Sequence, residues 1–315
     1  VTGVQTCALP ISIETAGYGL REDFMPKIAI MTDSNCGIMP DDAQKYHIHI
    51  LPMPVLVGED TFYEGCNITS EEFYRKLSSG EPVTTSQPSP ADVMKMWDQL
   101  LKEHDEAVHV PMSSGLSNSC QTALLLAQEE YFEGRVHVVD NHRISVTQAQ
   151  SVLDASVLAR QGLNGAQIKE ILETEAMDAT IYIAVDTLEY LKKGGRITTA
   201  AAAIGTVLNL KPVLTIQGDK LDAYTKTRGM KSAFKAMCKA LDKDLSGRLS
   251  GLHDQGLLKA GIAYTQMDPD TLGFFEEEMK KRYPDLELFQ LPLTMSIGSH
   301  TGPGALGIEI GRASC

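Results

Sequence analysis

The stretch VHVPMSSGLSNS, residues 108–119, joins an apolar strand that ends at Pro111 to a helix that we expect to run through Ala127. The first amides of a helix have no partners within it, and the helix dipole adds partial positive charge there, so this turn can hold an anion. Taken alone, however, the turn is more simply a helix cap, with Ser113 or Ser114 as the capping residue.

The same strand-and-helix pattern extends in both directions from this stretch. Apolar strands at Lys27, Ile48, Val108 and Val136 alternate with helical segments. This alternation predicts a mainly parallel sheet with helices on its faces, which we assign to an N-terminal α/β domain over residues 25–175. We expect residues 48–57 to form one strand, kept at an edge or in irregular pairing by its two prolines.

The second half of the chain has a different pattern, which predicts an α+β domain over residues 176–308. Strands are expected at residues 180–185, 212–216 and 221–224, with a hairpin turn at 217–220. An alanine-rich helix is expected over residues 198–210. The predicted fold class is therefore α/β with two domains, the first mainly parallel and the second α+β.

The two ends of the chain look like translated sequencing adapter rather than protein. We therefore expect residues 1–24 and 309–315 to be non-native or unstructured, with the natural start at Met25. A signal peptide is the competing explanation of the first residues, but no basic segment precedes an apolar core of adequate length.

Composition excludes several classes of function. A formal net charge of −13 argues against nucleic acid as a partner, because a phosphate-binding face needs a cationic stripe. No apolar run approaches the roughly 18 residues that cross a bilayer, so we expect no stable membrane insertion. Cys36, Cys66, Cys120 and Cys238 are scattered without metal-ligand spacing, which predicts reduced thiols in a cytoplasmic protein with no metal and no cofactor.

A second hydroxyl-rich loop, TTSQPSP at residues 84–90, precedes a helix that begins near Pro90. Ser89 as a helix cap explains part of this loop. It leaves unexplained why Thr84, Thr85 and Ser86 gather before it. The loop is therefore a candidate for a second set of hydroxyls that face an anion.

Six segments together resemble the DegV family of bacterial fatty-acid-binding proteins. They are VTTSQPS (83–89), PMSSGLSNS (111–119), LEYLKKGGRI (188–197), LNLKPVL (208–214), KTRG (226–229) and SIGSHTGPGALG (296–307). The resemblance extends from Lys27 to Ile308 with the segments in the family's order. It implies that the two domains enclose one long-chain fatty acid, such as palmitate or oleate, at their junction.

The resemblance also implies which residues hold the ligand. The carboxylate would be bound by Thr85, Ser86, Ser114, the amide of Gly115 at the start of the helix, and His300, while Arg196 would support the same polar region. Hydroxyls and amides suit this task because a carboxylate is an acceptor-only group. The tail would lie in an apolar tunnel.

The resemblance implies a carrier and not an enzyme, because members of this family do not carry out chemistry on the lipid themselves. It implies a monomer that presents the fatty acid to a separate fatty-acid kinase related to dihydroxyacetone kinases. The acyl-phosphate product would enter phospholipid synthesis. Arg228 and His300, with the lysines that follow Arg228, would contact the kinase or its ATP phosphates.

Two alternatives remain open at this point. In a serine hydrolase, Ser114 would be the nucleophile, His300 the base and Asp33 or Asp186 the residue that orients it. The sequence lacks the G-x-S-x-G segment of many such enzymes. The other alternative is a regulatory or interaction module without a ligand.

Overall fold

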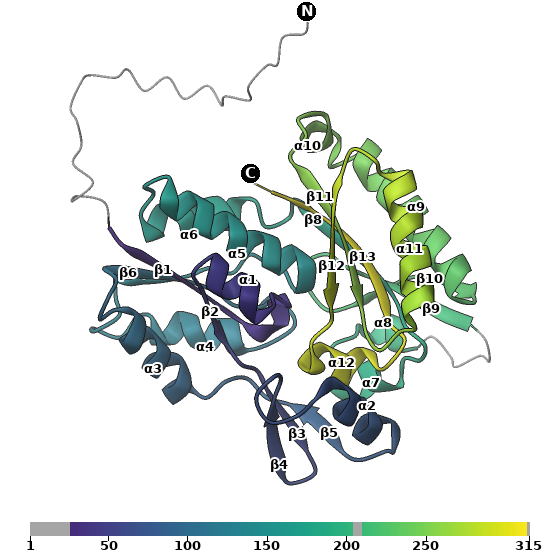
Figure 1. The fold of residues 1–315 in the computed structure, drawn as a ribbon, viewed down its shortest axis with the longest axis horizontal. Helices are drawn as coiled ribbons and strands as arrows, with labels where there is room; N and C mark the ends of the chain where they lie inside the picture. Colours follow the sequence, from purple (N-terminus) through teal and green to yellow (C-terminus); the bar gives the residue numbers. More distant parts are fainter. Residues whose placement is uncertain (1–25, 204–209, 314–315) are drawn as a thin grey trace, which may run out of the picture.

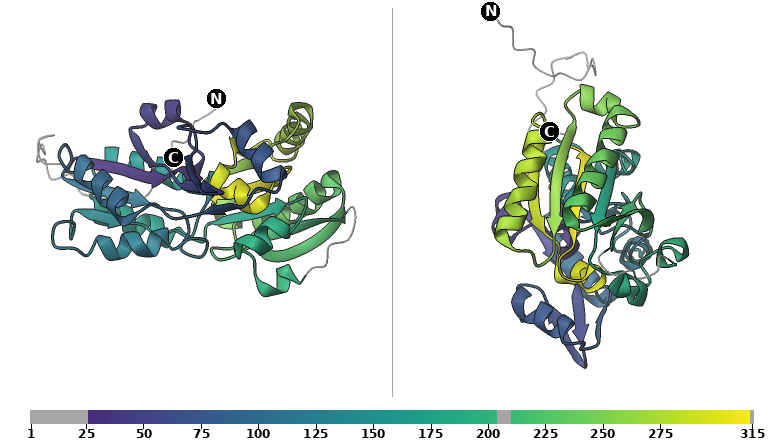
Figure 2. Two further views of the ribbon diagram at one scale, coloured as in Figure 1. Left: turned by 90° about the horizontal axis from the view of Figure 1, so that it is seen from below. Right: turned by 90° about the vertical axis from the view of Figure 1, so that its right-hand side faces the viewer.

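The structure is a computed structural model that describes residues 26–203 and 210–313. Residues 1–24, which we expect to be non-native or unstructured, lie outside the described residues. The expected start at Met25 also lies outside them. The two halves of the chain lie side by side along the long axis of the molecule (Figure 2).

A four-stranded parallel sheet forms the first half (Figure 1). In spatial order its strands are β2 (Ile48–Leu51), β1 (Ile28–Asp33), β6 (Glu106–Val110) and β7 (Val136–Val138). All three strand pairs are parallel, so the predicted sheet is confirmed.

Helices cover both faces of this sheet because alternate strand residues point to opposite sides. The face that carries Met31 packs against α3 (Pro90–Leu100) and α4 (Ser119–Leu126). The face that carries Ile30 packs against α1 (Pro40–Lys45), α5 (Ser145–Arg160) and α6 (Gly165–Thr174). A 3-10 turn, η2 (Ser34–Cys36), follows β1.

A small antiparallel module projects from the first half at the lower edge of Figure 1. It consists of β3 (Pro54–Val57), β4 (Asp60–Tyr63), β5 (Val83–Thr85) and α2 (Ser70–Ser78), with strand order β4-β3-β5. The expected single strand over residues 48–57 was wrong. The chain leaves the parallel sheet after Leu51 and enters this module at Pro54, because Pro52 has no N–H to continue the strand ladder.

A six-stranded mixed sheet forms the second half. Its strand order is β10 (Asp222–Arg228), β9 (Leu210–Ile216), β8 (Ala179–Ala184), β13 (Leu306–Arg312), β11 (Leu258–Tyr264) and β12 (Glu287–Pro292). Only β11 and β12 pair in parallel among the described strands of this sheet. The remaining helices are α7 (Glu189–Gly194), α8 (Thr199–Ala202), α9 (Met230–Ser246), α10 (Ser250–Asp254), α11 (Pro269–Arg282) and α12 (Met295–Thr301).

The two faces of the six-stranded sheet have different partners. Helices α9 and α11 bury one face around Phe234 and Phe275. The other face, with Ile181, Ile183 and Ile216, packs toward residues of the first half. This second face forms one wall of the cavity described below.

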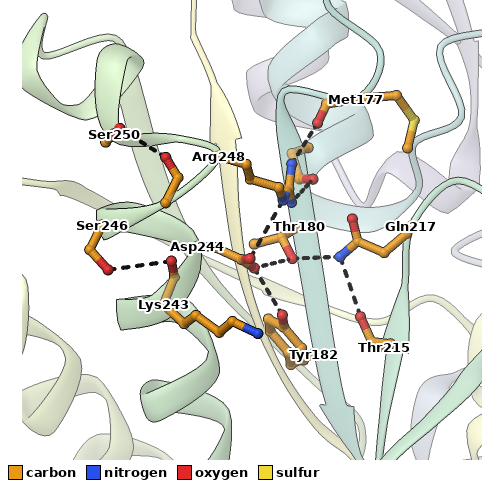
Figure 3. A network of polar contacts seen from close by, with 12 residues as sticks. Met177, Thr180, Tyr182, Thr215, Gln217, Lys243, Asp244, Ser246, Arg248 and Ser250 are labelled. Atoms are coloured by element: carbon orange, nitrogen blue, oxygen red, sulfur yellow. Dashed lines mark hydrogen bonds and ion pairs between the residues drawn. The ribbon is translucent and has the colours of Figure 1, made fainter.

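A polar network fixes β8 from the side of α9 (Figure 3). Asp244 of α9 accepts hydrogen bonds from the hydroxyls of Thr180, at 2.9 Å, and Tyr182, at 2.8 Å. Arg248 lies 3.5 Å from the other oxygen of Asp244 and donates to two backbone carbonyls at and just before the start of β8. Thr180 and Tyr182 alternate along β8 with the isoleucines of the opposite face, so the network holds the strand that carries the cavity wall.

Two further expectations need correction. The expectation that residues 309–315 lie outside the fold is wrong for residues 309–312, which belong to β13. Residues 309–311 pair with both β8 and β11, and Arg312 pairs with β11. The helix expected over residues 198–210 is described only as α8, residues 204–209 lie outside the described residues, and Leu210 already belongs to β9.

The chain crosses from the first half to the second between α6 and β8, close to the boundary expected at residue 175. Every strand of the parallel sheet precedes this crossing, and every strand of the six-stranded sheet follows it. The division into domains at residues 25–175 and 176–308 remains a prediction.

Candidate functional site

A cavity of about 420 Å³ lies between the first half and the six-stranded sheet. Its body is apolar, and its apolar lining residues are Met53, Met112, Leu116, Ile144, Ile181, Ile183, Leu191, Ile216, Leu221, Leu293 and Ile297. Its polar lining residues are Thr85, Ser86, Gln87, Ser117, Asn118, Thr122, Ser145, Arg196, Ser296, His300, Thr301 and Glu309. A cavity that combines an apolar wall with polar groups is the usual form of a site for a small organic ligand.

Four of the six expected ligand-binding residues line this cavity: Thr85, Ser86, Arg196 and His300. The structure therefore brings together residues from β5, the loop after it, the segment after α7, and α12. They come from three segments of the sequence that are far apart, so only the fold can assemble them.

His300 is held directly against Thr85. Its Nε2 atom lies 2.8 Å from the hydroxyl oxygen of Thr85. Burial, together with the nearby positive charge of Arg196, lowers the pKa of His300 to about 4. The ring is therefore neutral at pH 7, and at this site it serves as a hydrogen-bonding group and not as a cation.

Gly194 makes room for the His300 ring. A Cβ atom on Gly194 would lie 2.0 Å from Nδ1 of His300, which is far inside van der Waals contact. The His300 ring of SIGSHTGPGALG thus leaves no room for a side chain at the first glycine of LKKGGRI, and this contact brings the two segments together in the cavity wall.

Arg196 is the only cation that lines the described cavity. Its Nε donates to the carbonyl of Leu116 at 3.2 Å, and one terminal nitrogen donates to the carbonyl of Gly194 at 2.6 Å. These bonds fix the guanidinium plane. Among the described residues, no carboxylate forms an ion pair with it.

The remaining two expected residues do not line the cavity. Ser114 and Gly115 lie in a turn, and the expectation that they begin a helix was wrong, because α4 begins at Ser119. Their backbone amides are already used: Ser114 donates to Asp140 at 3.3 Å, and Gly115 donates to the hydroxyl of Ser113 at 3.1 Å.

The same turn instead presents its later residues to the cavity. Ser117 and Asn118 line it, although sequence reasoning did not select them. Both belong to the serine-rich segment at residues 108–119. The composition of that segment marked the turn, but which of its side chains face the cavity depends on the turn's three-dimensional path.

The arrangement required for a serine hydrolase is not assembled. Asp33 accepts from the backbone amides of Asn35 and Met112, and Asp186 pairs with Lys211 at 2.5 Å. Within the described part of the chain, Nδ1 of His300 has no hydrogen-bond partner that could orient it as a base. A triad needs that third group.

Arg228, expected to contact a partner protein, is the last residue of β10. Its side chain is exposed, and it does not line the cavity. Its location is therefore separate from that of the ligand-binding candidates.

Residues 26–203 and 210–313 contain neither a candidate membrane-spanning helix nor a candidate metal cluster. No helix there is long and apolar enough to cross a membrane. No group of three or more His, Cys, Asp or Glu side chains there could hold a metal ion.

Comparison with known proteins places the chain in a family. The sequence model of the family described as "Uncharacterised protein, DegV family" matches residues 27–312. A DegV domain-containing protein of Deinococcus radiodurans is 30% identical over 284 residues, which cover 90% of this chain and 98% of that protein. Protein DegV of Bacillus subtilis is 30% identical over 286 residues, with 89% and 98% covered.

Solved structures give the same result. The structure of a DegV family protein from Thermus thermophilus, described by its fatty-acid binding, has a TM-score of 0.81 at 33% identity and covers 91% of this chain and 99% of its own. The structure of DegV from Bacillus subtilis, described as a fatty-acid-binding protein, has a TM-score of 0.78 at 28% identity, with 91% and 99% covered. The resemblance read from the six sequence segments is confirmed, and this chain belongs to the DegV family.

Proposed function

We propose that this chain binds one long-chain fatty acid, such as palmitate or oleate, in the cavity between its two halves. The observation that carries the proposal is the position of Arg196, a cation beside the neutral ring of His300 in the wall of a cavity that also has a large apolar surface. Arg196 is partly buried, and a partly buried cation without a carboxylate partner favours an anionic ligand. The description of the Thermus thermophilus and Bacillus subtilis relatives as fatty-acid binding supports the same assignment.

The head group would be held by the side chains of Thr85, Ser86, His300 and Arg196, with Ser117 as a further donor. Ser114 and Gly115 were expected among these ligands, but they do not line the cavity and are left out of the proposal. The tail would lie against Ile181, Ile183 and their apolar neighbours. Each buried methylene contributes about 0.8 kcal/mol, so the tail dominates affinity while the polar groups fix orientation.

We further propose that the chain is a carrier subunit and not an enzyme. Acting as a cytoplasmic monomer, it would present the fatty acid to a separate kinase related to dihydroxyacetone kinases, and the acyl phosphate would feed phospholipid synthesis. Arg228 and the lysines after it would contact that kinase or its ATP phosphates. The exposure of Arg228, away from the cavity, is compatible with such a contact.

A series of fatty acids tests ligand binding. Affinities of octanoate, laurate and palmitate, measured by displacement of a fluorescent fatty acid, should rise with each added methylene until the cavity is filled. Palmitate and its methyl ester should differ, because the ester carries no charge for Arg196. Equal affinity across the series, or no binding of any member, would contradict the proposal.

A further inference from the structure

Glu64 contacts the start of α12 outside the cavity, and the same helix carries residues that line the cavity. Glu64 follows β4 in the small antiparallel module, and its side chain is partly buried. One carboxylate oxygen accepts a hydrogen bond from the backbone N–H of Met295 at 3.0 Å. Met295 is the first residue of α12, which later carries His300 into the cavity.

The start of α12 has no cap of its own. The residue before it, Thr294, makes no capping hydrogen bond with its side chain. The first amides of a helix need acceptors, and a carboxylate is the strongest neutral-pH acceptor among side chains. Glu64, from a distant part of the sequence, supplies one.

The same module contacts α12 at two other places. The hydroxyl of Tyr74 lies against the helix, where a Cβ atom on Gly298 would come within 2.3 Å of it. At the far end of the helix, Thr85 of β5 meets His300. Met295 itself is buried in the apolar core of the module, with Phe73 and Tyr74. The helix is therefore held against the module at both ends and in the middle.

We propose that Glu64 is a positioning residue for the ligand cavity: by holding the first turn of α12 through Met295, it fixes where Ser296, Ile297 and His300 face the ligand. This inference rests on the proposed fatty-acid binding. It differs from that proposal in assigning a role to a residue that does not touch the ligand.

The ionisation of Glu64 should make the hold on the first turn of α12 depend on pH. Burial raises the pKa of Glu64 to about 7. As pH rises through 7, the carboxylate becomes a stronger acceptor at the positive end of the helix, so the first turn of α12 should become better held. Tyr74 is a titratable group that faces Glu64, and burial raises the pKa of its hydroxyl far above this range.

Two other titratable groups line the cavity itself. The pKa of His300 is about 4, so this residue does not titrate between pH 6 and 8. Burial raises the pKa of Glu309 to about 8, so it titrates near the top of that interval. The ionisation of Glu309 and of the fatty acid affects the wild type and a Glu64 variant equally. The ratio of the oleate affinity of the wild type to that of the variant therefore reports the ionisation of Glu64 alone.

The experiment compares Glu64→Gln and Glu64→Ala with the wild type and with Glu71→Ala, which removes an exposed glutamate from the same module. Oleate affinity is measured at pH 6 and pH 8. In ligand-free protein, hydrogen exchange is measured for the amides of residues 295–301.

Glu64→Ala should weaken oleate binding by about tenfold at pH 8, the loss expected for one charge-assisted hydrogen bond. It should also speed exchange in α12, whereas Glu71→Ala should change neither. Glu64→Gln, which keeps an acceptor oxygen, should bind within about twofold of wild type at pH 6 and fall behind it at pH 8. If Glu64→Ala unfolds, the Gln variant alone decides.

Unchanged affinity and unchanged exchange in the Glu64 variants would overturn the inference and leave the proposed function standing. A constant ratio of wild-type to Glu64→Gln affinity across this pH interval would also overturn it. Faster exchange in α12 together with no oleate binding by the wild type would instead overturn the proposed function and leave the role of Glu64 in holding the helix intact.

Discussion

His300 and Thr85 meet through a 2.8 Å contact between Nε2 and the threonine hydroxyl, although 215 residues separate them in the chain. This contact joins α12 to β5 at the wall of the cavity. It also connects the two sequence segments, TTSQPS and SHTGPG, that were expected to share one site.

Replacing Thr85 by valine should remove the hydroxyl and leave Nε2 of the partly buried His300 without a partner. A lost hydrogen bond of this kind costs about 1–3 kcal/mol, so the dissociation constant for oleate should rise by about tenfold. Thr85→Ser should restore most of the affinity. Thr84→Val is the matched control, because Thr84 is exposed one residue earlier. Equal affinities for the Thr85 and Thr84 variants would show that the contact plays no part in binding.

Replacing Gly194 by alanine should push the His300 ring out of place, because the new Cβ would lie 2.0 Å from Nδ1. We expect a loss of about 1–3 kcal/mol in the free energy of unfolding, together with weaker oleate binding. Gly273→Ala is the control: Gly273 lies inside α11 with nothing within 4 Å of its Cβ position, so alanine should be neutral or stabilise by about 0.5–1 kcal/mol. Urea denaturation of both variants makes the comparison.

Replacing Arg196 by glutamine should raise the pKa of His300, because the positive charge of Arg196 is one of the two causes that lower it. Burial remains, so the pKa should move only part of the way toward its usual value. NMR titration of the histidine ring measures this shift, and oleate affinity should fall in the same variant. Lys193→Gln, which removes an exposed cation from α7, should alter neither quantity. A His300 pKa that is the same in both variants would refute the electrostatic link.

Acid should destabilise the protein partly through His109. This ring is fully buried, packs edge-on against Trp97, and has its pKa lowered to about 3 by burial. Between the unfolded value near 6.5 and this folded value, the unfolded chain binds more protons, so stability falls as pH falls. His109→Phe should flatten that part of the profile, measured as the free energy of unfolding from pH 7 to pH 4. An unchanged slope would mean that other groups cause it.

Replacing Arg228 by alanine should leave oleate affinity unchanged, since the side chain is exposed and does not line the cavity. With a fatty-acid kinase and ATP present, the same variant should slow formation of acyl phosphate. Lys45→Ala removes an exposed cation from α1 in the first half and serves as the control. Loss of oleate binding in Arg228→Ala would contradict the assignment of this residue to partner contact.

The mainly parallel sheet of the first half could be predicted from the sequence, because buried strands and their connecting helices carry strong local patterns. Four residues that line the cavity, Thr85, Ser86, Arg196 and His300, could also be selected from the sequence, because their segments resemble those of a known family. In contrast, Ser114 and Gly115 were selected where Ser117 and Asn118 line the cavity. The sequence of a serine-rich turn does not distinguish one serine from the next. Only the folded path of the turn decides which hydroxyls point into the cavity.

Two other features could not be predicted from local sequence patterns, because they depend on contacts between residues that are far apart in the chain. The division of residues 48–57 between two sheets depends on where the module of β3, β4 and β5 packs, and the proline that permits it is equally compatible with one irregular strand. Glu64 carries no local signal at all. Its importance comes from the amide of Met295, 231 residues later in the chain.

The most direct test of fatty-acid binding is native mass spectrometry of the purified protein, with identification of any lipid released on denaturation. We predict one fatty acid per chain, of palmitate or oleate length, and a reduced occupancy in the Thr85→Val variant. A protein that carries no lipid, and that takes up neither added oleate nor added palmitate, would contradict the account.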